Sequence, residues 1–284
     1  MKFNITRRSI LKIVLTAVAW ALAILWTTPF IGLFMVAIRP MEEIMHGWWN
    51  VGHFSFTYRN FITVWTGAEG SYPLHIGIRN SLIIAIFSSI IPLAISALAA
   101  YVFARFDFPV KNLIFLSIVL LMGIPQQIIA VPLFRIMKDL RLLNTYLGLI
   151  LAHSAWGAPW IILFLRNYFL TLPKELEEAA RVDGASDFQI FLKIVMPLSK
   201  PALLSILALQ FTWVWNDFFF ALLLMMTPDK YVATQCLAFL KGKYHVPWGL
   251  LGAGSIITMS LPILLYFALQ KYYIRGMIGW VIRG

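Results

Sequence analysis

The sequence predicts an all-α integral membrane protein with six transmembrane helices. Of its 284 residues, 61% are hydrophobic and only 12% are charged, and the mean hydropathy is +0.81. A soluble domain is about half apolar and about a quarter charged. The composition therefore excludes a soluble enzyme, a disordered chain and a coiled coil. The single cysteine, Cys236, excludes an internal disulfide framework.

Six apolar stretches have the length of a membrane span. A helix needs about 20 mostly apolar residues to cross the hydrocarbon core of a bilayer. The stretches are roughly 12–37, 80–103, 112–134, 146–166, 202–226 and 250–273. The first follows a basic N-terminus as a signal peptide would, but it is too long and no small-residue cleavage site follows it. We expect residues 1–11 to form a short N-terminal segment and residues 12–284 to form one transmembrane domain.

The lysines and arginines predict the orientation of these spans, because they concentrate on the cytoplasmic side of membrane proteins. The two termini, the segment between the second and third spans and the loop 167–201 hold 14 of them when Lys12, Arg166 and Lys271 at the span ends are included, and the other three connections hold nine. Both termini are therefore expected in the cytoplasm. Orientation and anionic lipid account for the net charge of +11, and no nucleic-acid partner is predicted.

The first outer segment, residues 38–79, mixes glycine and histidine with six aromatic side chains. These are Trp48, Trp49, Phe54, Phe56, Tyr58 and Trp65. Aromatic residues of this kind gather at membrane interfaces, and a docking surface for an external partner is the alternative. The sequence leaves both interpretations open.

Enzyme chemistry is not predicted for this chain. The Gly242-Lys243 pair is followed by Tyr244 and lacks the upstream glycine of a Walker A loop, so no ATP site of that kind is expected. The five histidines are scattered without metal-ligand spacing, so neither a metal nor a cofactor is expected on the chain. The absence of paired carboxylates inside the spans argues against a proton-driven pump.

The loop 167–201 is predicted to form two short helices on the cytoplasmic face. Pro173 suits the first turn of a helix, and Gly184 can end that helix in a left-handed conformation. Ser186 and Gln189 have the spacing of a capping box for the second helix. Pro197 is expected to stop or bend the second helix just before the membrane.

The first of these helices has a small apolar stripe with an acidic border. Leu176, Ala179 and Ala180 follow helical spacing, and Glu177 and Glu178 lie beside them. A helix of this shape suits a groove on another protein. The alternative, an amphipathic helix resting on lipid, is disfavoured because anionic lipid repels glutamates.

The sequence of this loop resembles the Glu-Ala-Ala loop of ABC importer permeases. The matching residues are Glu178-Ala179-Ala180-Arg181-Val182-Asp183-Gly184-Ala185 and Ile194-Val195-Met196-Pro197. Residues 79–82, 99–106, 124–125, 132–133, 143–150 and 215–217 resemble the carbohydrate-uptake branch, similar to the maltose and glycerol-phosphate transporter permeases. The resemblance covers roughly residues 75–284, and the first 74 residues fit in topology alone.

The resemblance implies the type I (MetI-like) ABC importer permease fold in a bacterial or archaeal cell membrane. It implies a second homologous permease, two ATP-binding subunits that carry ATP and Mg, and an external solute-binding protein that delivers a sugar. The loop would act as a coupling helix docked on an ATPase subunit. Its candidate residues are Glu178, Ala179, Ala180, Asp183, Gly184 and Pro197.

Polar residues within the spans are candidates for the substrate pathway. They are Gln126, Gln127, Gln210, Trp213, Asn216 and Asp217. Gln210, Trp213 and Asp217 are expected to share one stripe of a helix, where an aromatic face beside amide and carboxylate groups suits a sugar ring. Asp217 is the only acidic residue well inside a predicted span. A purely structural role, as a carboxylate satisfied by a neighbouring helix or by broken backbone, is the alternative for this residue.

The sequence thus predicts the permease subunit of a sugar ABC importer. A permease for peptides or polyamines is the first alternative, and residues 215–217 and the pattern of the third span argue against it. A secondary transporter without ATPase subunits is the second alternative.

Overall fold

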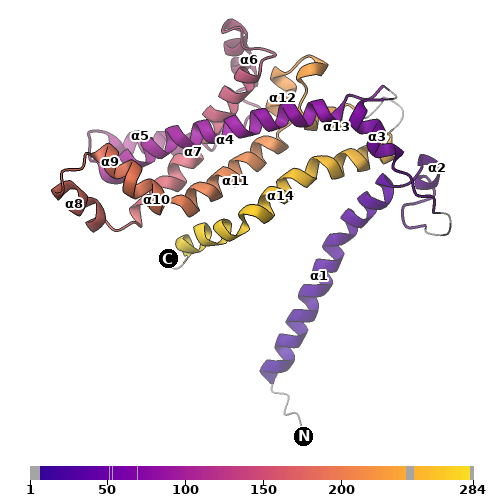
Figure 1. Ribbon diagram of the computed structural model, residues 1–284, viewed down its shortest axis with the longest axis horizontal. Coiled ribbons are helices and arrows are strands. Elements are labelled where there is room, and N and C mark those ends of the chain that lie inside the picture. The colour runs from indigo at the N-terminus through magenta and orange to yellow at the C-terminus, as the bar shows by residue number, and fades with distance from the viewer. Residues whose placement is uncertain (1–6, 51, 53, 69, 241–245, 282–284) are drawn as a thin grey trace. The chain divides into compact units, whose positions relative to one another are not determined.

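The computed structural model describes residues 7–50, 52, 54–68, 70–240 and 246–281. All regular elements in these ranges are helices (Figure 1), which confirms the all-α fold class. Residues 1–6 of the predicted N-terminal segment, the Gly242-Lys243 pair and the last three residues of the tail lie outside the described residues. The chain forms two compact units, Met1–Pro73 with Phe239–Ile257, and Leu74–Ala238 with Thr258–Gly284.

The first unit contains α1 (Arg7–Ala37), α2 (Met41–Ile44), α3 (Arg59–Thr66) and the beginning of α14 (Trp248–Val281). Helix α1 is long and has no polar face, and most of its described side chains are exposed. A Cβ atom at Gly252 would lie 3.1 Å from the Leu33 carbonyl oxygen and from the Ala37 nitrogen. A glycine at this position therefore lets α14 approach the backbone of α1 closely.

A buried arginine shapes the connection after α1. The Arg39 side chain is 1% exposed and donates to the Glu43 carboxylate (3.0 Å) and to the backbone oxygens of Trp48 (3.3 Å) and Asn50 (2.7 Å). Hydrogen bonds from Ser55, followed by those from Arg39, lower the pKa of Glu43 below its usual value. These bonds hold Trp48, Asn50 and Ser55 close to Arg39 and Glu43.

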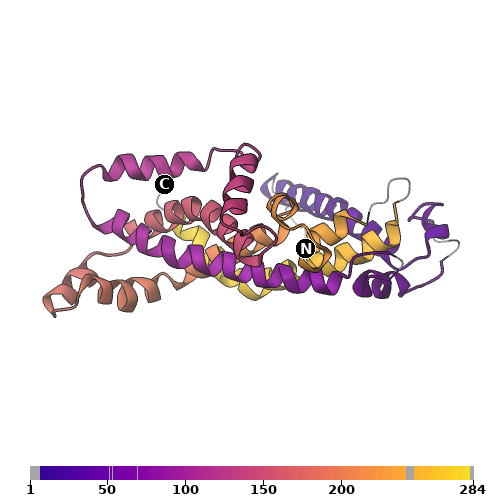
Figure 2. The same ribbon diagram turned by 90° about the horizontal axis from the view of Figure 1, so that it is seen from above.

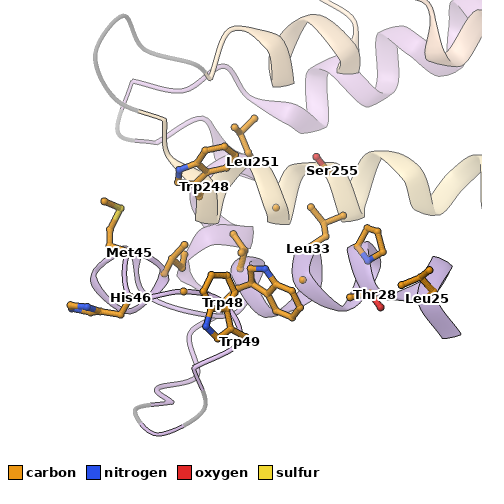
Figure 3. Close-up of a pocket in the computed structure, with 16 residues that line it drawn as sticks. Leu25, Thr28, Leu33, Met45, His46, Trp48, Trp49, Trp248, Leu251 and Ser255 are labelled. Atoms are coloured by element: carbon orange, nitrogen blue, oxygen red, sulfur yellow. The ribbon is translucent and has the colours of Figure 1, made fainter.

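The first unit also has an open, mostly apolar groove of about 1190 Å³. Figure 3 shows Trp48 and Trp49 on one side of it and Trp248 and Leu251 of α14 on the other. Two of the aromatic residues that the sequence places in the outer segment therefore lie together here, with their rings edge to face at 5.9 Å.

The second unit is built on three helices that pack side by side, α4 (Leu74–Arg105), α7 (Tyr146–Leu170) and α11 (Lys200–Asn216) (Figure 1). Small residues are buried on both α4 and α7, and small residues allow close approach of membrane helices. They are Ala85, Ser88, Ser89, Ala97 and Ala100 on α4 and Ala152, Ser154 and Gly157 on α7.

Shorter elements complete this unit. They are α5 (Lys111–Leu121), α6 (Ala130–Asp139), α8 (Glu175–Val182), α9 (Asp187–Ile190), the π-helical turn η1 (Phe191–Val195), α10 (Met196–Leu198), α12 (Phe219–Leu224), η2 (Pro228–Lys230) and α13 (Ala233–Ala238). Two apolar clusters fill the core, one around Trp215 and Phe220 and one around Tyr101 and Phe169.

Four helices of the described residues are long and apolar enough to cross a membrane. They are Ile10–Ala37, Leu74–Arg105, Tyr146–Leu170 and Trp248–Gln270. The pair Asp187–Leu198 and Lys200–Asn216, bent by 76°, makes a fifth if it counts as one broken span. These helices overlap five of the six predicted spans, and the count of six remains a prediction.

The predicted third span, residues 112–134, is not one continuous helix. It is divided into α5 and α6, and Figure 2 shows the chain turning between them. The turn contains Gly123 and Pro125. Proline disfavours helical conformation in the residue before it, so α5 ends at Leu121 and α6 starts only at Ala130.

Asn80 links α4 to two connections that are distant in sequence. Its side chain is buried, and its amide nitrogen donates to the backbone oxygens of Asp229 (3.0 Å) and Tyr231 (2.8 Å). Its amide oxygen accepts from the Tyr146 hydroxyl (2.8 Å) at the start of α7. One amide therefore holds α4, α7 and the segment after α12 together.

We expect Asn80→Ala to destabilise the protein by about 2–4 kcal/mol, because it leaves two carbonyls and a hydroxyl without their partner. Thermal inactivation of the detergent-purified protein measures the loss. Asn112→Ala, which changes an exposed asparagine on α5, is the matched control. An Asn80→Ala protein as stable as this control would contradict the linking role.

Candidate functional site

The loop between α7 and α11 has the two short helices that the sequence predicts. Ser186 Oγ accepts from the Gln189 backbone N–H (3.3 Å) and Gln189 Oε1 accepts from the Ser186 backbone N–H (2.9 Å), which confirms the capping box. The second helix continues through η1 into α10, where Pro197 lies, and the chain bends by 76° before α11. This is the bend expected near Pro197.

Gly184 ends α8 in the left-handed conformation, with φ +85°. The Ala185 N–H donates to the Ala180 oxygen (2.9 Å), and the Gly184 N–H donates to the Arg181 oxygen (3.0 Å). These two bonds form a Schellman motif. Arg181 also donates to Asp187 (3.0 Å) across the turn. The angle between α8 and α9 is therefore set by the glycine, the two backbone bonds and a surface ion pair.

The candidate coupling residues lie mainly on the exposed side of this loop. Glu178, Ala179, Asp183, Gly184 and Pro197 are exposed, and Ala180 is half-buried against the core. Apolar side chains are exposed beside them, with Leu176 at 48%, Val182 at 88% and Phe188 at 60%. The surface of α8 and α9 thus combines apolar groups with carboxylates, as a protein-docking surface does.

Glu177 points the other way. Its side chain is 3% exposed and its carboxylate lies 2.7 Å from Nε of Arg105, at the end of α4. The sequence pattern predicts Glu177 beside Glu178 on the border of the docking face, and this prediction is wrong. Consecutive side chains on a helix point about 100° apart around its axis. With Glu178 on the exposed side of α8, Glu177 therefore points toward α4.

A cavity of about 580 Å³ lies between α7, α11, α12 and the α5–α6 segment. Its wall is mostly apolar and contains three tryptophans and two polar side chains. These are Trp156, Trp160, Trp213, His153 and Gln210. An apolar pocket with a few convergent polar groups is the usual form of a small-molecule site.

Gln210 is buried at this cavity and makes two hydrogen bonds. Its Nε2 donates to the Ser88 backbone oxygen on α4 (3.1 Å), and its Oε1 accepts from Nε1 of Trp160 on α7 (3.0 Å). Gly157 on α7 leaves the room for this amide, because a Cβ atom there would collide with the Gln210 side chain. Trp213 lies one turn further along α11 and is 56% exposed.

Asp217 does not continue the stripe of Gln210 and Trp213. The helix α11 ends at Asn216, and Asp217 takes an extended conformation. Its Oδ2 accepts from the backbone N–H groups of Phe220 (3.0 Å) and Ala221 (3.3 Å) and lies 3.6 Å from His153 Nε2. The carboxylate therefore caps the start of α12.

The other predicted pathway residues lie apart from the walls of this cavity. Asn216 is exposed and donates to the Thr212 oxygen (2.9 Å) of its own helix. Gln126 is half-buried and Gln127 is exposed, in the turn after α5. The structure brings Gln210 and Trp213 together at the cavity, and the remaining residues are not part of its wall.

His153, Trp156 and Trp160 were not among the predicted site residues. They occur at i, i+3 and i+7 on the predicted fourth span, the same spacing that drew attention to residues 210–217. That spacing is the signal that could have found them. Within the described residues, no group of three or more His, Cys, Asp or Glu side chains could hold a metal ion.

These features agree with the family comparison. Residues 91–279 match the family described as binding-protein-dependent transport system inner membrane component, which is more than half of the chain. The chain therefore belongs to this family of multi-pass membrane transport proteins.

Several relatives match almost the whole chain. A probable ABC transporter permease protein of Pyrococcus horikoshii is 52% identical over 93% of this chain and 95% of that protein. An osmoprotective compounds uptake permease of Synechocystis is 40% identical over 92% of this chain and 89% of that protein. An arabinooligosaccharides transport system permease of Halalkalibacterium halodurans is 34% identical over 90% of this chain and 91% of that protein.

Solved structures show the same fold. One chain of a bacterial ABC transporter involved in the import of the acidic polysaccharide alginate superposes with a TM-score of 0.79 and 24% identity, over 96% of this chain and 100% of that chain. A chain of the MetNI methionine ABC transporter gives a TM-score of 0.56 over 72% of this chain and 94% of that chain. The MetI-like permease fold predicted from the sequence is thereby confirmed.

We expect Gly184→Val to distort the turn between α8 and α9. No atom lies within 4 Å of the position of the new Cβ atom, so the cost of about 1–3 kcal/mol arises from the backbone conformation alone. Trypsin should then cleave faster after Arg181 in membrane vesicles. Trypsin should cleave the Gly184→Asn protein at nearly the wild-type rate, since asparagine tolerates positive φ. Equal cleavage rates in both variants would argue against the turn.

Proposed function

We propose that this chain is the permease subunit of an ATP-driven importer of sugars or oligosaccharides and forms half of the translocation path. The cavity beside Trp156, Trp160 and Trp213 is the observation that carries this proposal. Aromatic faces stack on the C–H faces of sugar rings, and the amide of Gln210 and the imidazole of His153 can bond hydroxyl groups. Relatives named for alpha-glucoside, arabinooligosaccharide and trehalose/maltose transport support a carbohydrate substrate.

The importer would contain three further kinds of subunit. A second, homologous permease would complete the path, two ATP-binding subunits would hold and hydrolyse ATP with Mg, and an external solute-binding protein would deliver the sugar. A related transporter with a bound periplasmic protein and an alginate pentasaccharide supports the last of these. With both termini in the cytoplasm, the loop of α8 and α9 faces the ATP-binding subunits.

Within the path, we propose different roles for the candidate residues. Trp213 would stack on the sugar, and Gln210 would mainly hold Trp160 in place while its remaining hydrogen-bonding capacity faces the cavity. Asp217 would act by holding α12 at the cavity wall, together with His153. Asn216, Gln126 and Gln127 remain candidates for contacts on the path outside this cavity.

Trp213→Ala should lower sugar uptake roughly tenfold, the factor that corresponds to a loss of about 1.4 kcal/mol. Uptake is measured in proteoliposomes that contain the whole transporter and the solute-binding protein. Trp20→Ala removes an exposed tryptophan of α1, which is outside the cavity wall, and should leave uptake unchanged. Normal uptake by the Trp213→Ala protein at normal expression would refute the path through this cavity.

Glu178→Ala should weaken the contact with an ATP-binding subunit. Removal of one partner from a buried, hydrogen-bonded ion pair costs about 2–5 kcal/mol. We expect part of the ATP-binding subunits to copurify, with loss of the hydrolysis that the solute-binding protein stimulates. Full copurification with normal stimulated hydrolysis would show that α8 docks elsewhere or not at all.

A further inference from the structure

The inner face of α8 is tied to the end of α4 by three side chains. Arg105 donates from Nε to Glu177 Oε1 (2.7 Å), and the Tyr101 hydroxyl donates to Glu177 Oε2 (3.2 Å). Arg105 Nη2 also donates to the Leu172 backbone oxygen (3.3 Å), in the connection between α7 and α8. Both oxygens of one carboxylate are therefore held by the last turns of α4.

Aromatic rings from three further segments enclose these polar groups. The Tyr101 ring lies 5.2 Å from Phe191 in η1, 6.4 Å from Phe169 at the end of α7 and 5.9 Å from Phe106, measured between ring centroids. The side chains of Arg105 and Glu177 are only 4% and 3% exposed. Water is thus largely excluded from the ion pair.

Stability alone does not explain a buried ion pair at this place. The cost of removing two charges from water often exceeds their attraction, and apolar residues of the same volume often stabilise a protein as well or better. An ion pair differs from apolar packing because it is directional and permits one arrangement of its partners. Its effect here is to fix the orientation of α8 relative to α4.

We propose that Arg105, Tyr101 and Glu177 form an anchor that transmits movement of α8 to α4. The proposal rests on the docking of α8 described above as a proposed function. The exposed face of α8 would receive the movement of the ATP-binding subunit. The anchor would keep α8 from turning relative to α4, so that α4 moves with it. These three are positioning residues, and they contact neither ATP nor sugar.

The test uses Glu177→Gln in the complete transporter, reconstituted with its solute-binding protein. The readout is the amount of sugar taken up per ATP hydrolysed, because this ratio is independent of expression level and of the number of active complexes. We expect the ATP-binding subunits to copurify and the ratio to fall roughly 5- to 150-fold, the range that coupling between two sites spans. An unchanged ratio overturns the proposal.

Two matched variants serve as controls for this experiment. Asp107→Asn removes a fully exposed carboxylate that pairs with Lys111 just beyond α4, and it should leave the ratio unchanged. Glu177→Asp keeps the charge with a shorter side chain and should recover part of the ratio that Glu177→Gln loses. If aspartate and glutamine have equal effects, the charge has no part in coupling and the proposal fails.

The double variant Arg105→Gln with Glu177→Gln separates coupling from folding, because neither buried charge is left alone. We expect it to assemble with its ATP-binding subunits and to keep the low ratio. Normal coupling, or failure to assemble, would show that the cluster serves folding alone and would overturn the proposal. If the unaltered chain itself fails to copurify with ATP-binding subunits, the proposed docking of α8 is wrong, which is a different outcome.

Discussion

The second unit depends on one side-chain amide at the crossing of three helices. Gln210 of α11 binds the backbone of α4 at Ser88 and the indole of α7 at Trp160. The amide fits because Gly157 presents no Cβ atom to it. Gln210 is 3% exposed, so little water can replace these bonds, and an unpaired buried amide would cost several kcal/mol. The three helices are therefore held in one register at this point.

Two apolar clusters, one toward the cavity and one toward the loop of α8 and α9, pack against the helices that Gln210 joins. On one side, the cluster with Trp215 and Phe220 supports α12 and the cavity wall, and Trp215 donates to the Thr258 oxygen of α14 (3.1 Å). On the other side, the cluster with Tyr101 and Phe169 supports the loop of α8 and α9. The same pair of helices, α4 and α7, enters both clusters.

The sequence predicted correctly the features that depend on residues close together in the chain. The apolar stretches gave the long helices, and the spacing of Gly184, Ser186 and Gln189 gave the turn of the loop. The division of residues 112–134 into two helices was not predicted, although Pro125 is a helix breaker. The end of α11 was anticipated only in the alternative for Asp217, a carboxylate satisfied by broken backbone, and its bonds from Phe220 and Ala221 agree with that alternative. Pro125 and Asp217 both lie within long apolar runs, and these runs favoured one continuous span at each place. Glu177 could not be separated from Glu178, because its partner Arg105 lies 72 residues away in sequence.

One helix, α4, connects the loop of α8 and α9 to the helices around the cavity. Arg105 and Ser88 belong to one uninterrupted helix, and 17 residues of helix span about 25 Å. At one end of this stretch the helix holds α8 through Arg105, and at the other it accepts the bond of Gln210, which in turn fixes Trp160. Pro92 lies within this stretch and lacks the N–H that would donate to the Ser88 oxygen, which leaves that oxygen to accept from Gln210. In the proposed mechanism, the side chains at the two ends therefore decide whether movement of the loop reaches the cavity.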